Sequence, residues 1–196
     1  MITTSNEYER AFESWLYENQ IKYVAIDQSK RVKVSRDRIK SFDFLLYRPA
    51  HAGSLNRTKA DLPDRSDVII AEVKGRKFKG TSLASRTGFD SWVPVDDVKG
   101  LLNWEHTLDL QVGEVSEAIF VFAYKFANVD VETDGLEVYE FEDNKYMFYA
   151  IRIDDYVRSM KQRSPKWETV FLPADKFREH AIVIDEFLLG RKRAAV

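Results

Sequence analysis

An acid and a lysine stand two residues apart at the end of an apolar segment, residues 67–75, DVIIAEVKG. The Val and Ile residues of this segment predict a buried β-strand. Because side chains alternate across a strand, Glu72 and Lys74 are expected to leave the same face. Charged groups at the end of a buried strand are costly to desolvate unless they pair or bind something. We therefore interpret the pair as part of a site that binds a divalent metal and positions a water.

A further acid, Asp43, lies inside the preceding apolar segment, residues 41–47, SFDFLLY. Mg²⁺ takes oxygen ligands, usually one or two carboxylates together with backbone, phosphate and water oxygens. We expect Asp43 and Glu72 to supply the carboxylates and the carbonyl of Val73 a third oxygen, for Mg²⁺ or Mn²⁺. Lys74 would orient, or help to deprotonate, a water on the metal and stabilise charge that builds on a phosphate. Glu9, from a first helix, could complete the outer shell.

The spacing alone is a weak signal, because it occurs at three places. These are Glu72/Lys74, Asp97/Lys99 and Asp143/Lys145. Asp97 follows Pro94, where a helix is expected to begin, and Asp143 falls in an expected turn. Only Glu72 and Lys74 close a buried-strand pattern. The alternative interpretations are a salt bridge at a strand end for that pair, a buried acid bonded to a loop for Asp43, and a solvated flank position for Glu9.

The elements that must position these side chains alternate between helix and strand. The apolar patterns predict a helix over 4–19, strands over 22–27, 41–47 and 67–75, a helix over 94–109 and a strand over 117–126. A hairpin over 135–141 and 145–153, a helix over 154–162, a strand over 167–172 and a helix over 173–188 follow. Thr4 and Glu7 fit a capping box at the start of the first helix. A helix between the third and fourth strands implies a crossover and a mixed sheet covered on both faces.

The composition fits one globular domain over residues 1–196, with a core at about 4–126 and an extension at about 127–196. The chain has 196 residues, of which 44% are hydrophobic and none is cysteine. The absence of cysteine excludes disulfides and thiolate metal sites. We see no signal peptide and no apolar stretch near the roughly 20 residues of a membrane helix. A cytoplasmic protein with no membrane partner is the expectation.

The charge distribution leaves room for a nucleic-acid partner although the net charge is only −2. Basic residues gather at 30–40, after the 67–75 strand and at the end of the chain, whereas acids gather at 130–143. Such segregation can give one basic face on a nearly neutral molecule. The candidate phosphate contacts are Arg76, Lys77, Lys79 and Arg86, and the alternative is an ordinary solvated loop. Trp92 and Trp104 are expected in the core rather than as stacking platforms for bases.

The pattern of Glu9 in the first helix, Asp43 in a strand and Glu72-Val73-Lys74 in the next strand resembles the PD-(D/E)xK nuclease superfamily. The resemblance covers about residues 4–125. It implies a restriction-endonuclease-like αβββαβ core with a mixed central sheet, the fold of restriction endonucleases and archaeal Holliday-junction resolvases. The β-hairpin and helix expected after residue 126 would extend this core at its C-terminal end. It also implies that Glu9, Asp43, Glu72 and Lys74 are catalytic. Many nucleases of this fold are dimers, so a homodimer is expected by analogy only.

A second, local similarity concerns residues 7–13, EYERAFE. These resemble the signature of an uncharacterised bacterial family named for the pattern HYExAFE, with Glu7 where that family has His. The name of that family brings no established activity.

Three functions remain open at the level of sequence. The preferred one is a Mg²⁺-dependent nuclease that hydrolyses phosphodiester bonds in DNA or RNA. The alternative is a catalytically inactive module of the same fold that binds nucleic acid or a protein partner. A third is a protein-interaction domain that uses the apolar C-terminal extension.

Overall fold

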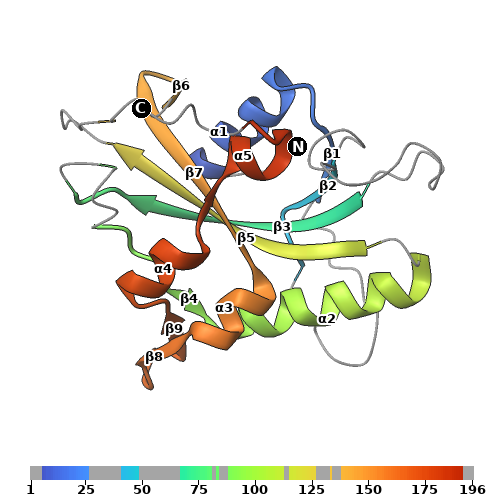
Figure 1. Cartoon of the computed structure of the whole chain (residues 1–196), viewed down its shortest axis with the longest axis vertical. Helices are drawn as coiled ribbons and strands as arrows, with labels where there is room; N and C mark the ends of the chain where they lie inside the picture. Colours follow the sequence, from blue (N-terminus) through green and yellow to red (C-terminus); the bar gives the residue numbers. More distant parts are fainter. Residues whose placement is uncertain are drawn as a thin grey trace.

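A seven-stranded mixed β-sheet runs through the middle of the molecule, with helices on both of its faces (Figure 1). It is seen in a computed structural model that describes residues 6–26, 41–48, 67–80, 83, 88–112, 115–126, 133 and 138–191. The expected α/β class, with a mixed sheet flanked by helices, is therefore confirmed. No helix within these ranges combines the length and the apolar character that crossing a membrane requires.

The first half of the chain builds one edge and the centre of the sheet. Helix α1 (Glu7–Glu18) is followed by an antiparallel meander of β1 (Lys22–Ala25), β2 (Phe44–Arg48) and β3 (Asp67–Lys77). Helix α2 (Val95–Val112) then carries the chain to β5 (Val115–Phe126), which pairs with β3 in parallel. A crossover helix is the usual way to join parallel neighbours. The order of helix, three strands, helix and strand is the one that the sequence predicts.

The second half of the chain extends the same sheet. Strands β6 (Tyr139–Phe141) and β7 (Asn144–Arg152) form the predicted hairpin, and β7 pairs with β5. Helix α3 (Ile153–Ser159) follows, and then a small second sheet in which β8 (Lys161–Ser164) pairs with β9 (Thr169–Phe171) and β9 with β4 (Val93–Pro94). Helix α4 (Ala174–His180), strand β10 (Ile182–Val183) and helix α5 (Ile184–Leu189) end the described chain.

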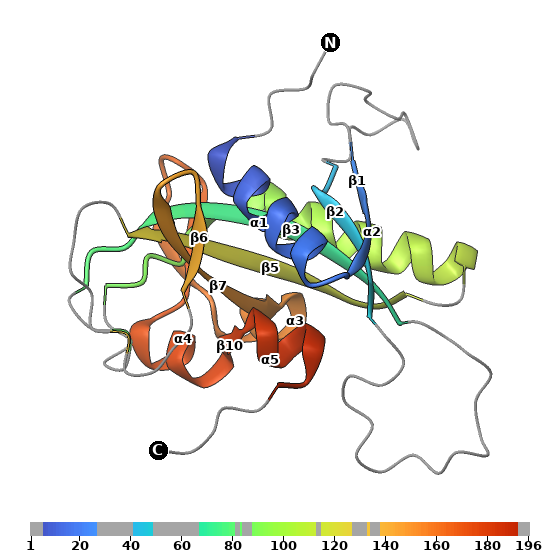
Figure 2. The same ribbon diagram turned by 90° about the horizontal axis from the view of Figure 1, so that it is seen from above.

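Alternation along β3 divides the core into two layers. Ile69, Ala71 and Val73 pack in the cluster that contains α1 and α5, whereas Val68 and Ile70 pack in the cluster that contains α2, α3 and α4. Figure 2 looks from above and shows α1 running across β3 and β5 while α5 lies over β7 and β10. Both faces of β3 are therefore covered, which explains its almost continuous apolar sequence.

Two sequence predictions in the C-terminal part are wrong. The single helix expected over 173–188 is broken into α4 and α5 by strand β10, which pairs Ile182 with Ala150 and Val183 with Tyr149 of β7. The run of Ile, Val and Ile at 182–184 fits a strand as well as a helix face, and an unfilled edge of β7 decides between them. The helix expected over 154–162 ends at Ser159, because the next residues form β8.

The capping box of α1 also differs from the prediction. Asn6 caps the helix by accepting hydrogen bonds from the backbone N–H groups of Tyr8 and Glu9, at 3.0 and 3.1 Å, and Glu9 accepts one in return from the backbone N–H of Asn6. The predicted partner Thr4 lies outside the described residues. The shift matters because it gives Glu9, a predicted site residue, a structural role.

A carboxylate on β5 ties three parts of the fold together. Oε1 of Glu117 lies 2.5 Å from Nη2 of Arg48 in β2, and Oε2 of Glu117 lies 2.6 Å from Nε of Arg152 in β7. Both guanidiniums lie over the ring of Phe187 in α5, with Cζ 4.8 and 5.2 Å from its centroid. Ion pairs of this kind are worth more than surface pairs because Glu117 is only 14% exposed.

We expect Glu117→Gln to lower the free energy of unfolding by about 1–3 kcal/mol, because it removes the charge from two short hydrogen bonds at once. Urea denaturation followed by circular dichroism measures the change. Glu140→Gln is the matched control, since Glu140 is 73% exposed and lies 3.8 Å from Lys145. Equal free energies of unfolding for Glu117→Gln and Glu140→Gln would contradict a stabilising role for the two ion pairs of Glu117.

Candidate functional site

The geometry of the site follows from where strands β2 and β3 stop pairing. Phe44, the first residue of β2, pairs with Ala71, so Asp43 stands beside the Glu72 position of β3. Beyond this point β3 continues to Lys77 along β5 alone, among the described residues. The polar half of β3 is therefore paired with β5 along one edge. Along its other edge, where β2 has ended, side chains can bond to the backbone of β3.

The carboxylate of Asp43 occupies that position. Its Oδ2 accepts a hydrogen bond of 2.7 Å from the backbone N–H of Val73, and the side chain is buried. In an antiparallel pair the N–H and C=O of one residue point to the same neighbour, so the carbonyl of Val73 also faces this side. The predicted metal ligands Asp43, Glu72 and Val73 thus come from one short stretch where two strands part.

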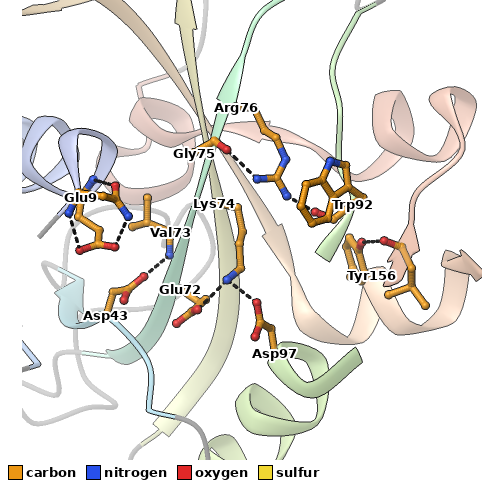
Figure 3. A network of polar contacts seen from close by, with 12 residues as sticks. Glu9, Asp43, Glu72, Val73, Lys74, Gly75, Arg76, Trp92, Asp97 and Tyr156 are labelled. Atoms are coloured by element: carbon orange, nitrogen blue, oxygen red, sulfur yellow. Dashed lines mark hydrogen bonds and ion pairs between the residues drawn. The ribbon is translucent and has the colours of Figure 1, made fainter. Parts of the chain in front are cut away.

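Glu72 and Lys74 form an ion pair on one face of β3. Lys74 Nζ lies 2.7 Å from Glu72 Oε1 and 2.5 Å from Oδ2 of Asp97, which extends from the first turn of α2 (Figure 3). The exposed fractions of Glu72 and Asp97 are only 4% and 3%. A lysine held between two buried carboxylates is fixed in position and in charge.

The electrostatics of this group follow from burial and charge acting in opposite directions. Burial, the largest influence, would lower the pKa of Lys74. The carboxylates of Glu72 and Asp97 together outweigh it, and the pKa lies above its ordinary value. Lys74 is accordingly an ammonium group at neutral pH, suited to donate hydrogen bonds.

Glu9 lies near this cluster but bonds to the cap of its own helix. Its carboxylate accepts hydrogen bonds from both the backbone and the side chain of Asn6. Burial raises the pKa of Glu9, the backbone bond from Asn6 lowers it and the charge of Glu72 raises it further. The charge of Glu72 therefore influences the pKa of Glu9. A role of Glu9 in the outer coordination shell of a metal ion stays a prediction.

The close approach of α1 to β3 depends on Gly75. The ring of Tyr8, on α1, packs so tightly on Gly75 that a Cβ at this position would overlap Cδ2 and Cγ of the ring. Glycine is the residue that allows such an approach to a strand. Tyr8 also meets the ring of Tyr146 edge to face, at 6.2 Å between centroids. The glycine that follows Lys74 thereby sets the distance between α1 and β3.

The predicted phosphate contacts do not behave as one group. Arg76 lies two residues beyond Lys74 on the same face of β3 and is partly buried, whereas Lys77 and Lys79 lie farther along the chain. Lys79 is 68% exposed and pairs with Asp90 at 2.7 Å. Arg86, like the basic residues at 30–40, lies outside the described residues.

The two tryptophans considered above, Trp92 and Trp104, differ in their surroundings. Trp104 packs against the core and meets Phe42 edge to face, with 5.4 Å between the ring centroids, as expected. Trp92 is only partly buried and lies under the guanidinium of Arg76, with Cζ 4.1 Å from the ring centroid. The prediction that Trp92 lies in the core is therefore wrong, because it belongs to neither buried cluster and its ring carries a cation instead.

Sequence reasoning missed Asp97 as a member of the site. The pattern of an acid two residues before a lysine drew attention to Asp97 and Lys99, but Lys99 is 70% exposed and its carboxylate neighbour is Asp96, 4.0 Å away. The useful signal was helical spacing. Asp97 stands four residues before the buried Leu101, so it lies beside the apolar stripe that faces the sheet.

The comparisons with known proteins add no assignment to this geometry. No protein-family model matches the sequence, and no curated protein matches it significantly. In the part of the chain that the structure describes, no group of three or more His, Cys, Asp or Glu side chains is arranged to hold a metal. A metal site here would rest on two carboxylates, a carbonyl and waters.

We expect Asp97→Asn to lower the free energy of unfolding by about 1–3 kcal/mol, because it weakens a buried ion pair to Lys74. Thermal and urea denaturation measure the change. Asp96→Asn, at a carboxylate 76% exposed in the same helical turn, is the control and should change stability by less than about 0.5 kcal/mol. A cost at Asp97 no larger than at Asp96 would show that the pair is not stabilising.

We expect Gly75→Ala to destabilise the fold by about 1–3 kcal/mol through its overlap with the ring of Tyr8. The test is a double-mutant cycle with Tyr8→Ala, which removes the ring. The cost of Gly75→Ala should fall by at least about 1 kcal/mol in the Tyr8→Ala background. Strictly additive costs would mean that Tyr8 does not require the glycine.

Proposed function

We propose that this protein is a Mg²⁺-dependent nuclease that hydrolyses phosphodiester bonds in DNA or RNA. The observation that carries the proposal is the position of Asp43 beside the Glu72 position where β2 and β3 part, together with the ion pair of Glu72 and Lys74. Two buried carboxylates beside a fixed ammonium are the groups that metal-assisted phosphoryl chemistry uses.

The topology supports the resemblance to PD-(D/E)xK nucleases. A helix, an antiparallel meander of three strands, a crossover helix and a parallel fourth strand follow one another in the order that the resemblance implies. Asp43 immediately precedes the second strand of the meander, and Glu72 and Lys74 lie in the third. We propose the restriction-endonuclease-like core on this ground.

The donor set fits Mg²⁺ as the group to be held. Asp43 and Glu72 would hold it, with the carbonyl of Val73 as a further oxygen, and waters would complete the usual octahedral set. Bound there, the ion would supply Lewis acidity and charge neutralisation at a phosphate. Asp43 would have to share its carboxylate between this role and the N–H of Val73, which its two oxygens permit.

Lys74 and Asp97 would then have different roles in the reaction. Lys74, as an ammonium, would donate hydrogen bonds to a phosphate oxygen or to the attacking water and stabilise the negative charge that grows on the phosphate. Asp97 is a positioning residue in this scheme, because it holds Lys74 and acts on the substrate only through it. Burial of both acids limits competition from bulk water for these bonds.

The alternative, an inactive module of the same fold that binds nucleic acid or a protein partner, has one observation in its favour. Lys74 is already paired with Glu72 and Asp97, and these ion pairs could serve stability alone. Cleavage and metal binding separate the two functions.

The test of the nuclease is cleavage of labelled single-stranded DNA, duplex DNA and RNA with Mg²⁺ or Mn²⁺. We expect cleavage by the native protein and a fall of about 10²-fold or more in Lys74→Met, because an electrostatic donor is removed. Lys99→Met is the control, since Lys99 is an exposed lysine in the adjacent helix. Near-ultraviolet circular dichroism checks that each variant is folded.

Calorimetric titration with Mn²⁺ supplies a readout independent of cleavage. Saturable binding that disappears in Asp43→Asn and persists in Asp96→Asn supports the proposed ligands. A folded native protein that binds no Mn²⁺ and cuts none of the three substrates would overturn the nuclease. Binding of nucleic acid by that same inactive protein would establish the alternative.

A further inference from the structure

A cluster of positive charge begins two residues beyond Lys74 on the same face of β3. Arg76 donates from Nη1 to the carbonyl of Gly75 at 2.6 Å and from Nη2 to the carbonyl of Trp92, and its Cζ lies 4.1 Å from the Trp92 ring centroid (Figure 3). A step of two residues along a strand is about 7 Å. Arg76 is thus the next cation along this face of the strand from the candidate catalytic lysine.

The C-terminal part of the chain adds another guanidinium to the same ring. Cζ of Arg163, in β8, lies 4.9 Å from the Trp92 ring centroid. The approach has a clear structural cause, because β9 pairs Val170 with both Gln162 of β8 and Val93 of β4, the residue after Trp92. The register of β8 against β9 shifts between Gln162 and Ser164, so Arg163 stands at a bulge, a device that re-aims a side chain.

Within the described part of the chain, the charge of these two cations is not balanced by an ion pair. Among the residues that the structure describes, neither Arg76 nor Arg163 has a carboxylate within ion-pair distance. The nearby carboxylate of Asp90 is taken by Lys79 at 2.7 Å. Burial is the largest influence on the pKa of Arg76 and lowers it; the charge of Asp90 raises this pKa in part, and the like charge of Arg163 lowers it. Two guanidiniums on one ring, one of them partly buried, favour the binding of an anion.

The surface beside them is hollowed. A pocket of about 390 Å³ is lined by Trp92 and Arg163 together with residues 89–91, 171 and 172. Ser91 Oγ is engaged with the backbone of Leu172, accepting from its N–H at 3.1 Å and donating to its C=O at 3.0 Å. The pocket wall is therefore built partly by the C-terminal segment and joined to the strand that precedes α2.

We propose that Arg76 and Arg163, held on Trp92, bind a backbone phosphate of a nucleic-acid strand that extends from the candidate catalytic site. Guanidinium groups match phosphate geometry and are held at low entropic cost when they stack on an aromatic ring. The identity of the ligand as DNA or RNA rests on the proposed function, whereas the anion site rests on the two arginines themselves. The role of the small β4-β9-β8 sheet is then to bring Arg163 to the strand.

The test is fluorescence anisotropy with labelled single-stranded DNA, duplex DNA and RNA, with EDTA present so that no cleavage occurs. Arg163→Ala should weaken binding about three- to tenfold. The slope of log affinity against log salt should fall by about 0.7 for a single strand or 0.9 for duplex DNA, as expected when one phosphate fewer is neutralised. Arg163→Glu should weaken binding further, and Arg163→Lys should keep most of the salt slope.

Arg158→Ala is the matched control. Arg158 is an exposed arginine of α3, 3.5 Å from Asp155, and its removal should leave affinity and slope unchanged. The inference is overturned if Arg163→Ala binds nucleic acid with the same affinity as the native protein and Arg158→Ala. It is also overturned if the native protein binds none of the three nucleic acids. A native protein that never cleaves, but whose binding is weakened by Arg163→Ala, keeps the phosphate site and refutes only the nuclease.

Discussion

The arrangement of this molecule depends on the ion pairs that the ammonium group of Lys74 makes with Glu72 and Asp97. They join the central strand β3 to the helix α2 that crosses over it. Charged groups this deeply buried are stable only when they are paired. The apolar sequence of β3 can therefore become polar while the strand is still inside the sheet, and charged side chains can lie at its end.

The parting of β2 from β3 supplies the second constraint. Because β2 begins opposite Ala71, the N–H of Val73 needs a partner that a strand does not provide, and the carboxylate of Asp43 fulfils this need. The same bond that satisfies the backbone brings an acid next to Glu72. Structural and chemical demands thus coincide, which is why the pair of acids fits both a nuclease and an inactive module of the same fold.

The C-terminal part of the chain is integrated with this site. Strand β7 extends the sheet beyond β5, and β9 pairs with the two residues that precede α2. The hydroxyl of Tyr156 in α3 donates to the carbonyl of Ser91 at 2.7 Å, just before Trp92 in the chain. The position of α2, and with it the position of Asp97, is consequently set from both ends of the sequence.

The sequence by itself determined the order of α1, β1, β2, β3, α2 and β5 and the hairpin of β6 and β7, the covered central sheet, and the place of Asp43, Glu72 and Lys74 on two neighbouring segments. These follow from local alternation and from the short-range rules of strand pairing. Tertiary structure alone decided that Asp97 reaches Lys74, that Arg163 reaches Trp92, and that residues 182–183 leave the helical pattern for the edge of β7. Each of these depends on contacts between residues distant in the chain, and local spacing carries no information about which distant edge or charge will be adjacent.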